Sequence, residues 1–303
     1  METRTDLTAF AAKIGEVRKR IADVVVGQTE AVDMLLTCII ADGHVLLEGV
    51  PGVAKTLLAR LMSRLIDARF SRIQFTPDLM PSDVLGTSVF NMKTQEFSFH
   101  PGPAFADIIL ADEINRAPAK TQAALFEVME ERQATIDGTS YKMGDVYTII
   151  ATQNPIEQEG TYRLPEAQLD RFLMKITMGY PSLDDEVEIL RRHNEHTSFA
   201  RLEDVEPIIT KEELMELRKM MGSVVVDPSL LRYIAQIVGE SRESAAVYVG
   251  CSPRASVAML NCAKAYALIG GRDFVVPDDI KTVAPYIMQH RLQLTAESEM
   301  EGF

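Results

Sequence analysis

The residues best suited to chemistry lie in a glycine-bearing segment, GVPGVAKT, at positions 49–56. An apolar run at 45–47 precedes it and a helix-forming run follows from Leu57, which predicts a turn between a strand and a helix. Such a turn points backbone N–H groups at one place, where they bind phosphate, while Lys55 adds a charge and Thr56 a hydroxyl for Mg²⁺. The candidate nucleotide-binding residues are therefore Gly49, Val50, Pro51, Gly52, Val53, Ala54, Lys55 and Thr56.

One position departs from the usual phosphate-binding pattern, G-x-x-x-x-G-K-[ST], because Ala54 stands where the second glycine is expected. A β-carbon makes positive φ unfavourable. We therefore predict a negative φ at Ala54, and we expect Ala54→Gly to leave ATP hydrolysis largely intact.

Polar residues follow two further apolar strands. Asp112 and Glu113 come after 108–111, which places them at the carboxyl edge of a parallel sheet, where ligands bind. Asp112 is suited to hold Mg²⁺ through water, and Glu113 to polarise a water that attacks the γ-phosphate. Asn154 follows the strand at 146–152 and is suited to orient that water, although asparagine before proline is also a common turn former.

Two arginines are candidates for contact with phosphate. Arg171 stands at a helix end before the last strand, where it could stabilise transferring phosphoryl oxygens of a neighbouring subunit; the alternative is an ion pair with Asp170 or Glu166. Arg254 lies in the first turn of a helix, where a cation opposes the helix dipole. We therefore predict that it points at a ligand when a helical lid closes over the phosphates.

Alternating strands and helices must position these residues. Strands are predicted at 45–48, 69–75, 108–111, 146–152 and 172–177, after two helices at 7–21 and 28–40. This alternation predicts a mostly parallel sheet that is covered on both faces. The segments 90–99 and 134–143 are predicted to be hairpins that project from this core.

The pattern changes after Pro181, and no further strand is predicted beyond it. Helical periodicity continues at 184–193, 211–220, 228–240, 254–269 and 277–290. We therefore divide the chain into an α/β domain, 1–180, and a helical domain, 181–303.

Composition limits the classes of function. The net charge of −13 and the pI near 4.9 argue against broad electrostatic capture of nucleic acid, so proteins are the expected partners. The three cysteines form no C-x-x-C pair, which favours reduced thiols over a disulfide or zinc site. No signal peptide or membrane span is predicted, so we expect a cytoplasmic protein without membrane insertion.

Five motifs together resemble one known group. GVPGVAKT, ILADEINRAP, ATQNP, LPEAQLDRF and GCSPRAS follow in this order across nearly the whole chain, which is similar to the MoxR group of AAA+ ATPases. The resemblance implies an α/β P-loop NTPase core, with a parallel five-stranded sheet of order 5-1-4-3-2, and a C-terminal helical lid domain. The segments 90–99 and 134–143 would be its helix-2 insert and its pre-sensor hairpin.

The resemblance also implies the role of each site residue. It makes Lys55 and Thr56 Walker A residues, Asp112 and Glu113 Walker B residues, Asn154 sensor 1, Arg171 the arginine finger, Arg254 sensor 2, and Gly27 and Gln28 part of the segment that lines adenine.

The function implied by the resemblance is Mg²⁺-dependent hydrolysis of ATP to ADP and phosphate. The chain would form a homo-oligomeric ring, most simply a hexamer, with Arg171 and also Arg116 reaching across subunit interfaces. It would remodel or mature client proteins as a chaperone, often with a von Willebrand factor A domain protein, and the sequence names neither the client nor the partner.

Other classes of nucleotide-binding protein fit less well. The chain lacks the N-K-x-D motif of GTPases and the L-S-G-G-Q motif of transporter ATPases. A DNA- or transcription-directed AAA+ motor of the helix-2-insert group is the main alternative, but the segment 90–99 lacks a basic cluster and the G-A-F-T-G-A tip. A scaffold that binds nucleotide without turnover is disfavoured because Glu113, Asn154 and Arg171 are all present.

Overall fold

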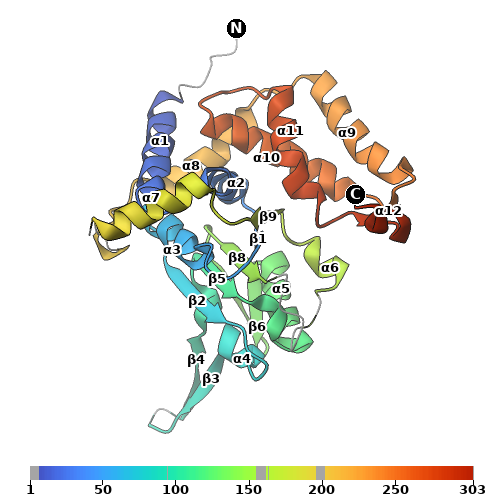
Figure 1. Ribbon diagram of the computed structural model, residues 1–303. Coiled ribbons are helices and arrows are strands. Elements are labelled where there is room, and N and C mark those ends of the chain that lie inside the picture. Colours follow the sequence, from blue (N-terminus) through green and yellow to red (C-terminus); the bar gives the residue numbers. More distant parts are fainter. Residues whose placement is uncertain (1–6, 94, 155–161, 163, 196–201, 303) are drawn as a thin grey trace.

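The centre of the molecule is a parallel sheet of five strands (Figure 1). The computed structural model describes residues 7–93, 95–154, 162, 164–195 and 202–302. The strands follow the order β2-β5-β8-β1-β9, and all neighbours are parallel, which confirms the predicted order 5-1-4-3-2. Their bounds are β1 (Val45–Gly49), β2 (Phe70–Gln74), β5 (Ile108–Asp112), β8 (Thr148–Gln153) and β9 (Met174–Met178).

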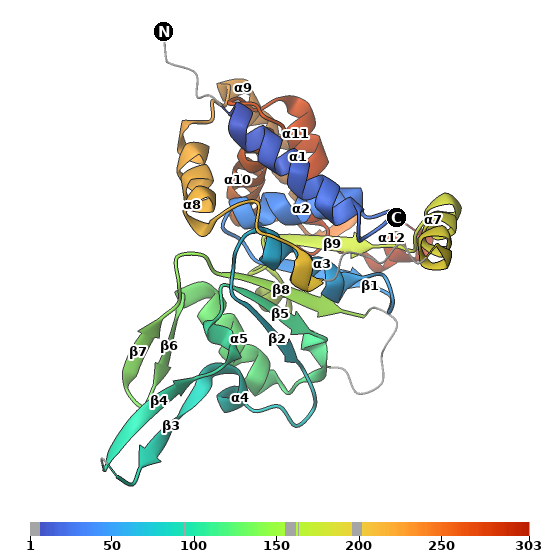
Figure 2. The ribbon, with the colours of Figure 1, turned by 90° about the vertical axis from the view of Figure 1, so that its left-hand side faces the viewer.

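Alternate residues of each strand face opposite sides of the sheet, and each side has its own apolar cluster. Val45 and Leu47 belong to one cluster and Leu46 to the other, as the period of two along a strand requires. Figure 2 shows the first side covered by α1 (Thr8–Ala22), α2 (Thr29–Ile40) and α3 (Lys55–Leu65). The second side is covered by α4 (Pro81–Leu85) and α5 (Ala119–Glu131).

Both predicted hairpins are present and lie on the α5 side of the sheet (Figure 2). The longer one pairs β3 (Gly86–Asn91) with β4 (Glu96–Pro101), and the shorter one pairs β6 (Gln133–Ile136) with β7 (Thr139–Lys142). The short turn at Asp137 and Gly138 has positive φ at both residues, as two-residue hairpin turns require. The rings of Phe99 and Tyr141 stack at 4.2 Å and join the hairpins.

The chain beyond β9 is mainly helical, as predicted. It contains α7 (Leu183–Asn194), α8 (Lys211–Met220), α9 (Pro228–Glu243), α10 (Pro253–Ile269), α11 (Pro277–Met288) and α12 (Ala296–Glu301). The prediction of no further strand is wrong, because β10 (Val247–Val249) and β11 (Gln293–Leu294) form an antiparallel pair. Strands of three and two residues are too short to show a period in the sequence.

The C-terminal helices pack onto the first side of the sheet through α2. α10 contacts α2, α9 and α11, and their apolar residues join those of the sheet in one cluster. The buried guanidinium of Arg218, on α8, donates to the carbonyl of Ile39 at 2.8 Å and fastens α8 to α2. The described helices include none with both the length and the apolar character needed to cross a membrane.

Short helices complete the described structure. They are α6 (Glu166–Leu169) and the 3₁₀ segments η1 (Pro103–Phe105), η2 (Ile114–Arg116), η3 (Leu202–Asp204) and η4 (Met221–Ser223).

Candidate active site

The predicted phosphate-binding segment forms a turn between the strand β1 and the helix α3, as the sequence indicated. β1 ends at Gly49 and α3 begins at Lys55, so Lys55 and Thr56 lie in the first turn of the helix, where free N–H groups point outward. The ammonium group of Lys55 donates to the carbonyl of Gly49 and thereby closes the turn on itself. A phosphate bound in the turn offers this ammonium group a charged acceptor in place of the carbonyl.

The prediction of a negative φ at Ala54 is wrong. Ala54 has φ 63° and ψ 21°, the left-handed conformation, directly before α3. The turn requires this conformation whichever residue is present, which explains the glycine of the general pattern. An L-residue there costs about 1–2 kcal/mol. The methyl group of Ala54 packs against the apolar cluster and lines the neighbouring pocket, and this contact offsets part of the strain.

An apolar pocket of about 230 Å³ lies beside the turn. Gln28 lines it, and its amide donates to the carbonyl of Gly179 at 3.3 Å; its contact with adenine stays a prediction. Gly27 does not line the pocket but lies against α7, where an added β-carbon would be 2.7 Å from a carboxylate oxygen of Asp185. A flat, apolar purine ring suits such a pocket. It is lined by Val24, Val25, Val26, Gln28, Gly52, Val53, Ala54, Leu57, Pro181 and Ile189.

The acids Asp112 and Glu113 are joined by a hydroxyl of the next strand. Thr152, on β8, donates to Oδ1 of Asp112 at 2.6 Å and accepts from the backbone N–H of Glu113 at 2.9 Å. Glu113 has φ 55°, so the chain turns sharply directly after the buried strand. Thr152 therefore fixes the positions of both acids, a role that its sequence context did not suggest.

Three further residues bind these two acids, and we had predicted none of them at the active site of the same chain. Arg72 donates two hydrogen bonds to Oδ2 of Asp112, at 2.6 and 3.1 Å. Oε2 of Glu113 accepts from Gln74 at 2.8 Å and from Arg116 at 2.9 Å. Arg116 was predicted to reach a neighbouring subunit, but the structure places it on its own Glu113. The predicted neighbours in the sheet could have identified Arg72 and Gln74, because β2 ends beside β5.

The residues present fit a magnesium ion. A carboxylate from Asp112 and a hydroxyl from Thr56 are oxygen donors, which Mg²⁺ prefers, and P-loop proteins add phosphate oxygens and water to such a pair. In the part of the chain that the structure describes, no group of three or more His, Cys, Asp or Glu is placed to hold a metal ion. A magnesium site with Asp112 and Thr56 as its protein ligands is consistent with the donor atoms present.

Asn154 lies next to the turn, as predicted. Glu48 of β1 pairs with Gln153 of β8, so Asn154 is level with Gly49 at the same edge of the sheet. Its side chain is buried, with a residue exposure of 8%. Pro155, the last residue of the ATQNP motif, lies outside the described residues.

The two predicted arginines lie at the opposite edge of the sheet. Arg171 precedes β9, whose first residue pairs with Val45 at the start of β1. Arg254 is 69% exposed and pairs with Asp170 at 3.5 Å. The predicted phosphate-binding turn follows the carboxyl end of β1, so the five residues of β1 separate the turn from the level of Arg171. In this conformation Arg254 binds Asp170, and its contact with phosphate stays a prediction.

Arg171 forms an ion pair, but not with the residues that we considered. Its guanidinium pairs with Glu130 and donates to the carbonyl of Phe126 at 3.3 Å, both on α5. Its buried Nε–H has no hydrogen-bond partner among the described residues. A buried donor without a partner is unfavourable, so this contact with α5 leaves Arg171 incompletely satisfied.

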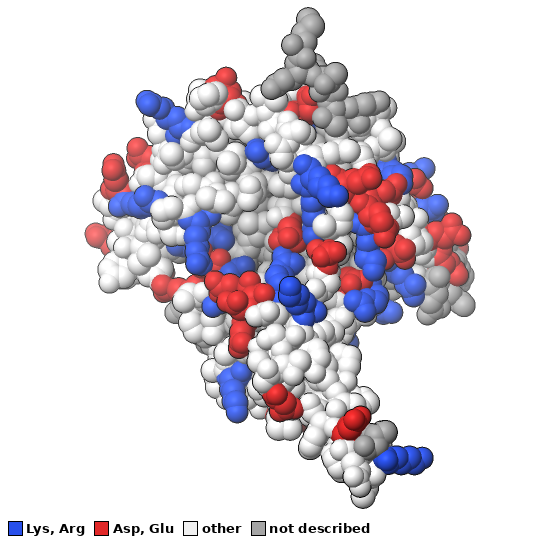
Figure 3. Space-filling view, turned by 180° about the vertical axis from the view of Figure 1, so that it is seen from behind, with Lys and Arg blue, Asp and Glu red and all other residues white. Residues whose placement is uncertain are grey.

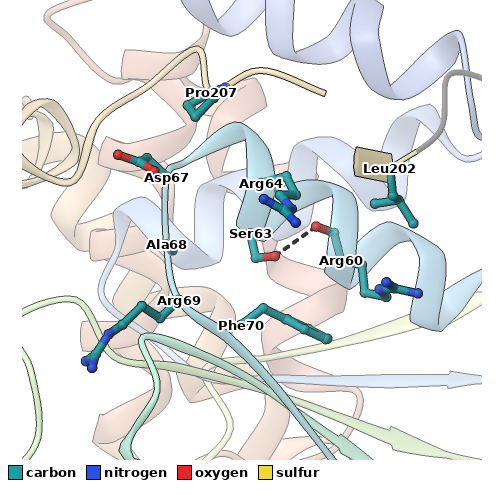
Figure 4. A pocket seen from close by; sticks show the side chains of 9 residues that line it. All are labelled: Arg60, Ser63, Arg64, Asp67, Ala68, Arg69, Phe70, Leu202 and Pro207. Carbon is teal, nitrogen blue, oxygen red and sulfur yellow. Dashed lines mark hydrogen bonds between the residues drawn. The ribbon is translucent and has the colours of Figure 1, made fainter. Parts of the chain in front are cut away.

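A larger cavity, of about 450 Å³, lies away from all of these residues (Figure 4). Arg60 and Arg64 extend from α3 beside the ring of Phe70, the first residue of β2. Arg69 also lines it but pairs with Asp107 at 2.9 Å. The cavity is thus at the amino edge of the sheet, away from the phosphate-binding turn, and contains none of the predicted site residues.

Comparisons with known proteins agree with this geometry. A model of the ATPase family associated with various cellular activities (AAA) matches residues 44–174, and a model of the AAA lid domain matches residues 239–302. The chain is 47% identical to uncharacterised protein YeaC of Bacillus subtilis, over 95% of this chain and 89% of that one. It is 42% identical to Chaperone MoxR1 of Mycobacterium tuberculosis, over 95% of this chain and 78% of that one.

A solved structure shows the same fold. A provisionally assigned ATPase from Cytophaga hutchinsonii superposes with a TM-score of 0.89 at 43% identity, covering 98% of this chain and 92% of that one. The motifs, the order of the strands and these relatives agree, and the chain belongs to the MoxR family of AAA+ ATPases.

Proposed function

We propose that this chain hydrolyses ATP with Mg²⁺ at sites between the subunits of a homo-oligomeric ring, most simply a hexamer, and uses the cycle to remodel client proteins. The observation that carries the proposal is the carboxyl edge of the sheet, where Lys55 follows β1 and Asp112 and Glu113 lie at the end of β5, which β8 separates from β1, beside a pocket that suits adenine. Residues 1–180 would form the nucleotide-binding core and 181–303 the lid.

The residues of this edge have separable roles in the proposed reaction. Lys55 exchanges the Gly49 carbonyl for a phosphate oxygen, and Glu113 accepts a proton from the attacking water, which Asn154 orients. Arg116 and Gln74 both donate to Oε2 of Glu113, which leaves its Oε1 to accept the proton. Mg²⁺, held by Thr56 and Asp112, would neutralise charge on the phosphates.

A ring is favoured because Arg171 and Arg254 lie far from the phosphate-binding turn of their own chain. The same edge of a second copy, placed against the turn, would bring both arginines to the γ-phosphate. Contact between two unlike surfaces is head-to-tail, and it forms a closed ring if the rotation closes.

Such a ring would bring two sides of neighbouring molecules together, and exposed apolar residues lie on both of these sides. On α7, Leu183, Val187 and Leu190 are 78%, 56% and 63% exposed at helical spacing. Tyr248, on β10, is 77% exposed and precedes α10, which carries Arg254. α7 and α12, which contacts β11, lie on opposite sides in Figure 1. Exposed apolar surface of this kind is common at protein interfaces.

Client proteins are the proposed substrate of the motion. The β3–β4 hairpin exposes Phe90, Met92 and Phe97, and the rings of Phe90 and Phe97 are 5.1 Å apart. An apolar tip on a projecting hairpin suits contact with unfolded or partly folded polypeptide. The relative MoxR1 is named a chaperone. From the family resemblance we propose a von Willebrand factor A domain protein as the partner. We propose that the protein acts in the cytoplasm.

Nucleic acid is not the substrate that we propose. Figure 3 shows charges of both signs interspersed over one face of the body, and a hairpin that is largely uncharged. Nucleic-acid motors need a continuous basic surface to follow phosphates. The MoxR relatives likewise do not favour the DNA-directed alternative.

The Glu113→Gln variant tests this function. We expect it to bind ATP but to lose at least about 100-fold in turnover, because the amide cannot accept the proton. Glu127→Gln, on the exposed face of α5, is the matched control and should keep full turnover. The trapped ATP state should also retain client proteins in a pull-down from lysate. Unchanged turnover in Glu113→Gln would contradict the proposal.

A further inference from the structure

The segment that carries Arg171 is held by the C-terminal helices. Arg291 follows α11 and is 5% exposed at its side chain. Its Nε donates to Oδ1 of Asp170 at 2.7 Å, one terminal nitrogen donates to the carbonyl of Phe172 at 2.7 Å, and the other to that of Leu173 at 3.2 Å. The same guanidinium thus binds the residues on both sides of Arg171.

The two residues that precede Arg291 in the chain also bind the backbone at the start of β9 and just before it. The ring of His290 hydrogen-bonds to the same Phe172 carbonyl at 2.9 Å, and the amide of Gln289 donates to the carbonyl of Lys175. Arg254, at the start of α10, adds an ion pair to the carboxylate of Asp170. The backbone on both sides of Arg171 therefore has a firm attachment to α10 and α11.

The side chain of Arg171 itself points elsewhere, to the carbonyl of Phe126 and to Glu130 on α5. Its backbone follows the C-terminal helices while its guanidinium rests on the core. A shift of α11 relative to α5 would change the direction in which Arg171 points.

β9 also reaches the pocket for nucleotide at its other end. β9 ends at Met178, and three residues later Pro181 lines the pocket of the same chain. Gln28, which lines the same pocket, donates to Gly179 in the connecting segment. One strand of five residues thus connects the pocket with the segment of Arg171.

We propose that Arg291 is a positioning residue, through which the placement of the lid in one subunit sets the direction of Arg171 and so the rate of ATP hydrolysis in the next subunit. This inference rests on the proposed function, because it requires that Arg171 act on a neighbour. Arg291 does not line the apolar pocket beside the turn; it acts through the backbone of Asp170, Phe172 and Leu173.

The Arg291→Gln variant measures the effect. We expect kcat for ATP to fall about 10- to 100-fold, because a small misplacement of a catalytic group costs this much. The KM and the dissociation constant for ATP should change less than about threefold, since the pocket lies at the other end of β9. The matched control is Arg272→Gln, which removes a similar ion pair with Asp279 at 2.6 Å, within the C-terminal helices and away from β9. It should keep kcat within about threefold.

A mixing experiment separates positioning from loss of structure. Arg291→Gln copies have an intact turn and Glu113, whereas Glu113→Gln copies cannot hydrolyse ATP but keep an intact Arg171. We expect a mixture of the two to hydrolyse ATP several-fold faster than the sum of the separate proteins, because a Glu113→Gln neighbour supplies a correctly placed Arg171. A damaged Arg291→Gln subunit would gain nothing from such a neighbour.

The outcomes distinguish this inference from the proposed function. A mixture of Arg171→Ala with Glu113→Gln serves as the reference. If the reference gains activity and the Arg291→Gln mixture does not, the inference is wrong and the trans role of Arg171 stands. If the reference gains nothing, the proposed trans role is wrong. An equal loss of kcat in Arg272→Gln would also overturn the inference.

Asp170→Asn provides a second variant if Arg291→Gln does not fold. It keeps the backbone carbonyls that Arg291 binds and removes only the charge that Arg291 and Arg254 share. We expect the same pattern with a smaller loss, about three- to tenfold in kcat, and a gain on mixing with Glu113→Gln. Full kcat in folded Asp170→Asn and in folded Arg291→Lys would contradict the proposal.

Discussion

The two edges of the central sheet differ in how complete they are within one chain. The carboxyl edge carries the phosphate-binding turn with Lys55, the acids Asp112 and Glu113, and an apolar pocket for a base. The amino edge carries Arg171, which binds Glu130 and the carbonyl of Phe126, and Arg254, which pairs with Asp170. We propose that the groups at the carboxyl edge bind a nucleotide and activate water, and that the cations at the amino edge act on the phosphates bound by another copy.

This difference supports our proposal that the active site is divided between copies. The carboxyl edge should bind nucleotide in a single subunit, whereas rapid hydrolysis should need the amino edge of a second one. Changes at the two edges should therefore differ in whether a neighbour can compensate for them.

The largest effect is expected at the amino edge, from Arg171→Ala. Loss of an arginine that stabilises phosphoryl transfer lowers kcat by about 10³-fold, while ATP binding should be unchanged. Arg64→Ala is the control, because Arg64 is exposed on α3 and has no ion pair among the described residues. Steady-state kinetics and a binding titration check both parts. An equal loss of ATP affinity in Arg171→Ala would remove the distinction between the edges.

At the carboxyl edge, Thr152→Val should disturb both acids at once. Valine keeps the shape but leaves the N–H of Glu113 and one oxygen of Asp112 without the hydroxyl. We expect a loss of about 2 kcal/mol in the free energy of unfolding and at least a tenfold loss in kcat.

A matched control for Thr152→Val lies on the same strand. The buried hydroxyl of Thr148 has no hydrogen-bond partner among the described residues, so Thr148→Val should be neutral or stabilising. Chemical denaturation and kinetics check the pair of variants. Equal effects of the two substitutions would show that the bridge between the acids is unimportant.

Acid should weaken the amino edge, where two neutral histidines are buried. Burial, aided by nearby Arg132 and Arg291 respectively, lowers the pKa of His44 and of His290 from 6.5 to about 3. Because these pKa values fall on folding, the unfolded chain binds protons first as the pH falls. Stability is then complete above about pH 6.5 and decreases toward pH 3, by about 2 kcal/mol for each histidine at pH 5.

The His290→Gln variant separates the two histidines. The glutamine amide can still donate to the carbonyl of Phe172, as the ring of His290 does, but it does not titrate. Denaturant titrations at pH 7 and pH 5 should therefore show about half the acid-induced loss in this variant. A stability that does not change between these pH values would contradict the assignment of both histidines.

The smallest effect is expected at Ala54. Glycine relieves the strain of positive φ but makes the unfolded chain more flexible, so Ala54→Gly should change the free energy of unfolding by less than about 1 kcal/mol. ATP hydrolysis should remain largely intact. Ala54→Val should be less stable than the parent by more than about 1 kcal/mol, because a branched residue tolerates this conformation poorly. Denaturation of both variants checks the corrected backbone angle.

The sequence predicts the sheet well because its three central strands, β1, β5 and β8, are largely buried apolar runs next to a turn or helix signal. It predicts the residues of the carboxyl edge for the same reason, since Asp112 and Asn154 directly follow such strands. β10 and β11 were missed because two or three residues do not show a period, and their pairing joins segments about 45 residues apart.

The remaining errors concern geometry that a linear sequence does not contain. Neither the left-handed conformation of Ala54 nor the bridge through Thr152 has a local signal, because the fold around the turn imposes both. The attachment of Arg291 to Asp170 joins residues 121 positions apart. The motif identified Arg254, but only the packing of α10 shows that it lies at the amino edge.

The most direct test of the divided site is to mix two inactive variants. Arg171→Ala copies keep an intact carboxyl edge, and Glu113→Gln copies keep an intact amino edge. In random rings of equal parts, about one quarter of all sites would combine both intact edges, so ATPase activity should rise to about one quarter of the natural rate per subunit. A mixture no more active than the sum of its two components would contradict the account.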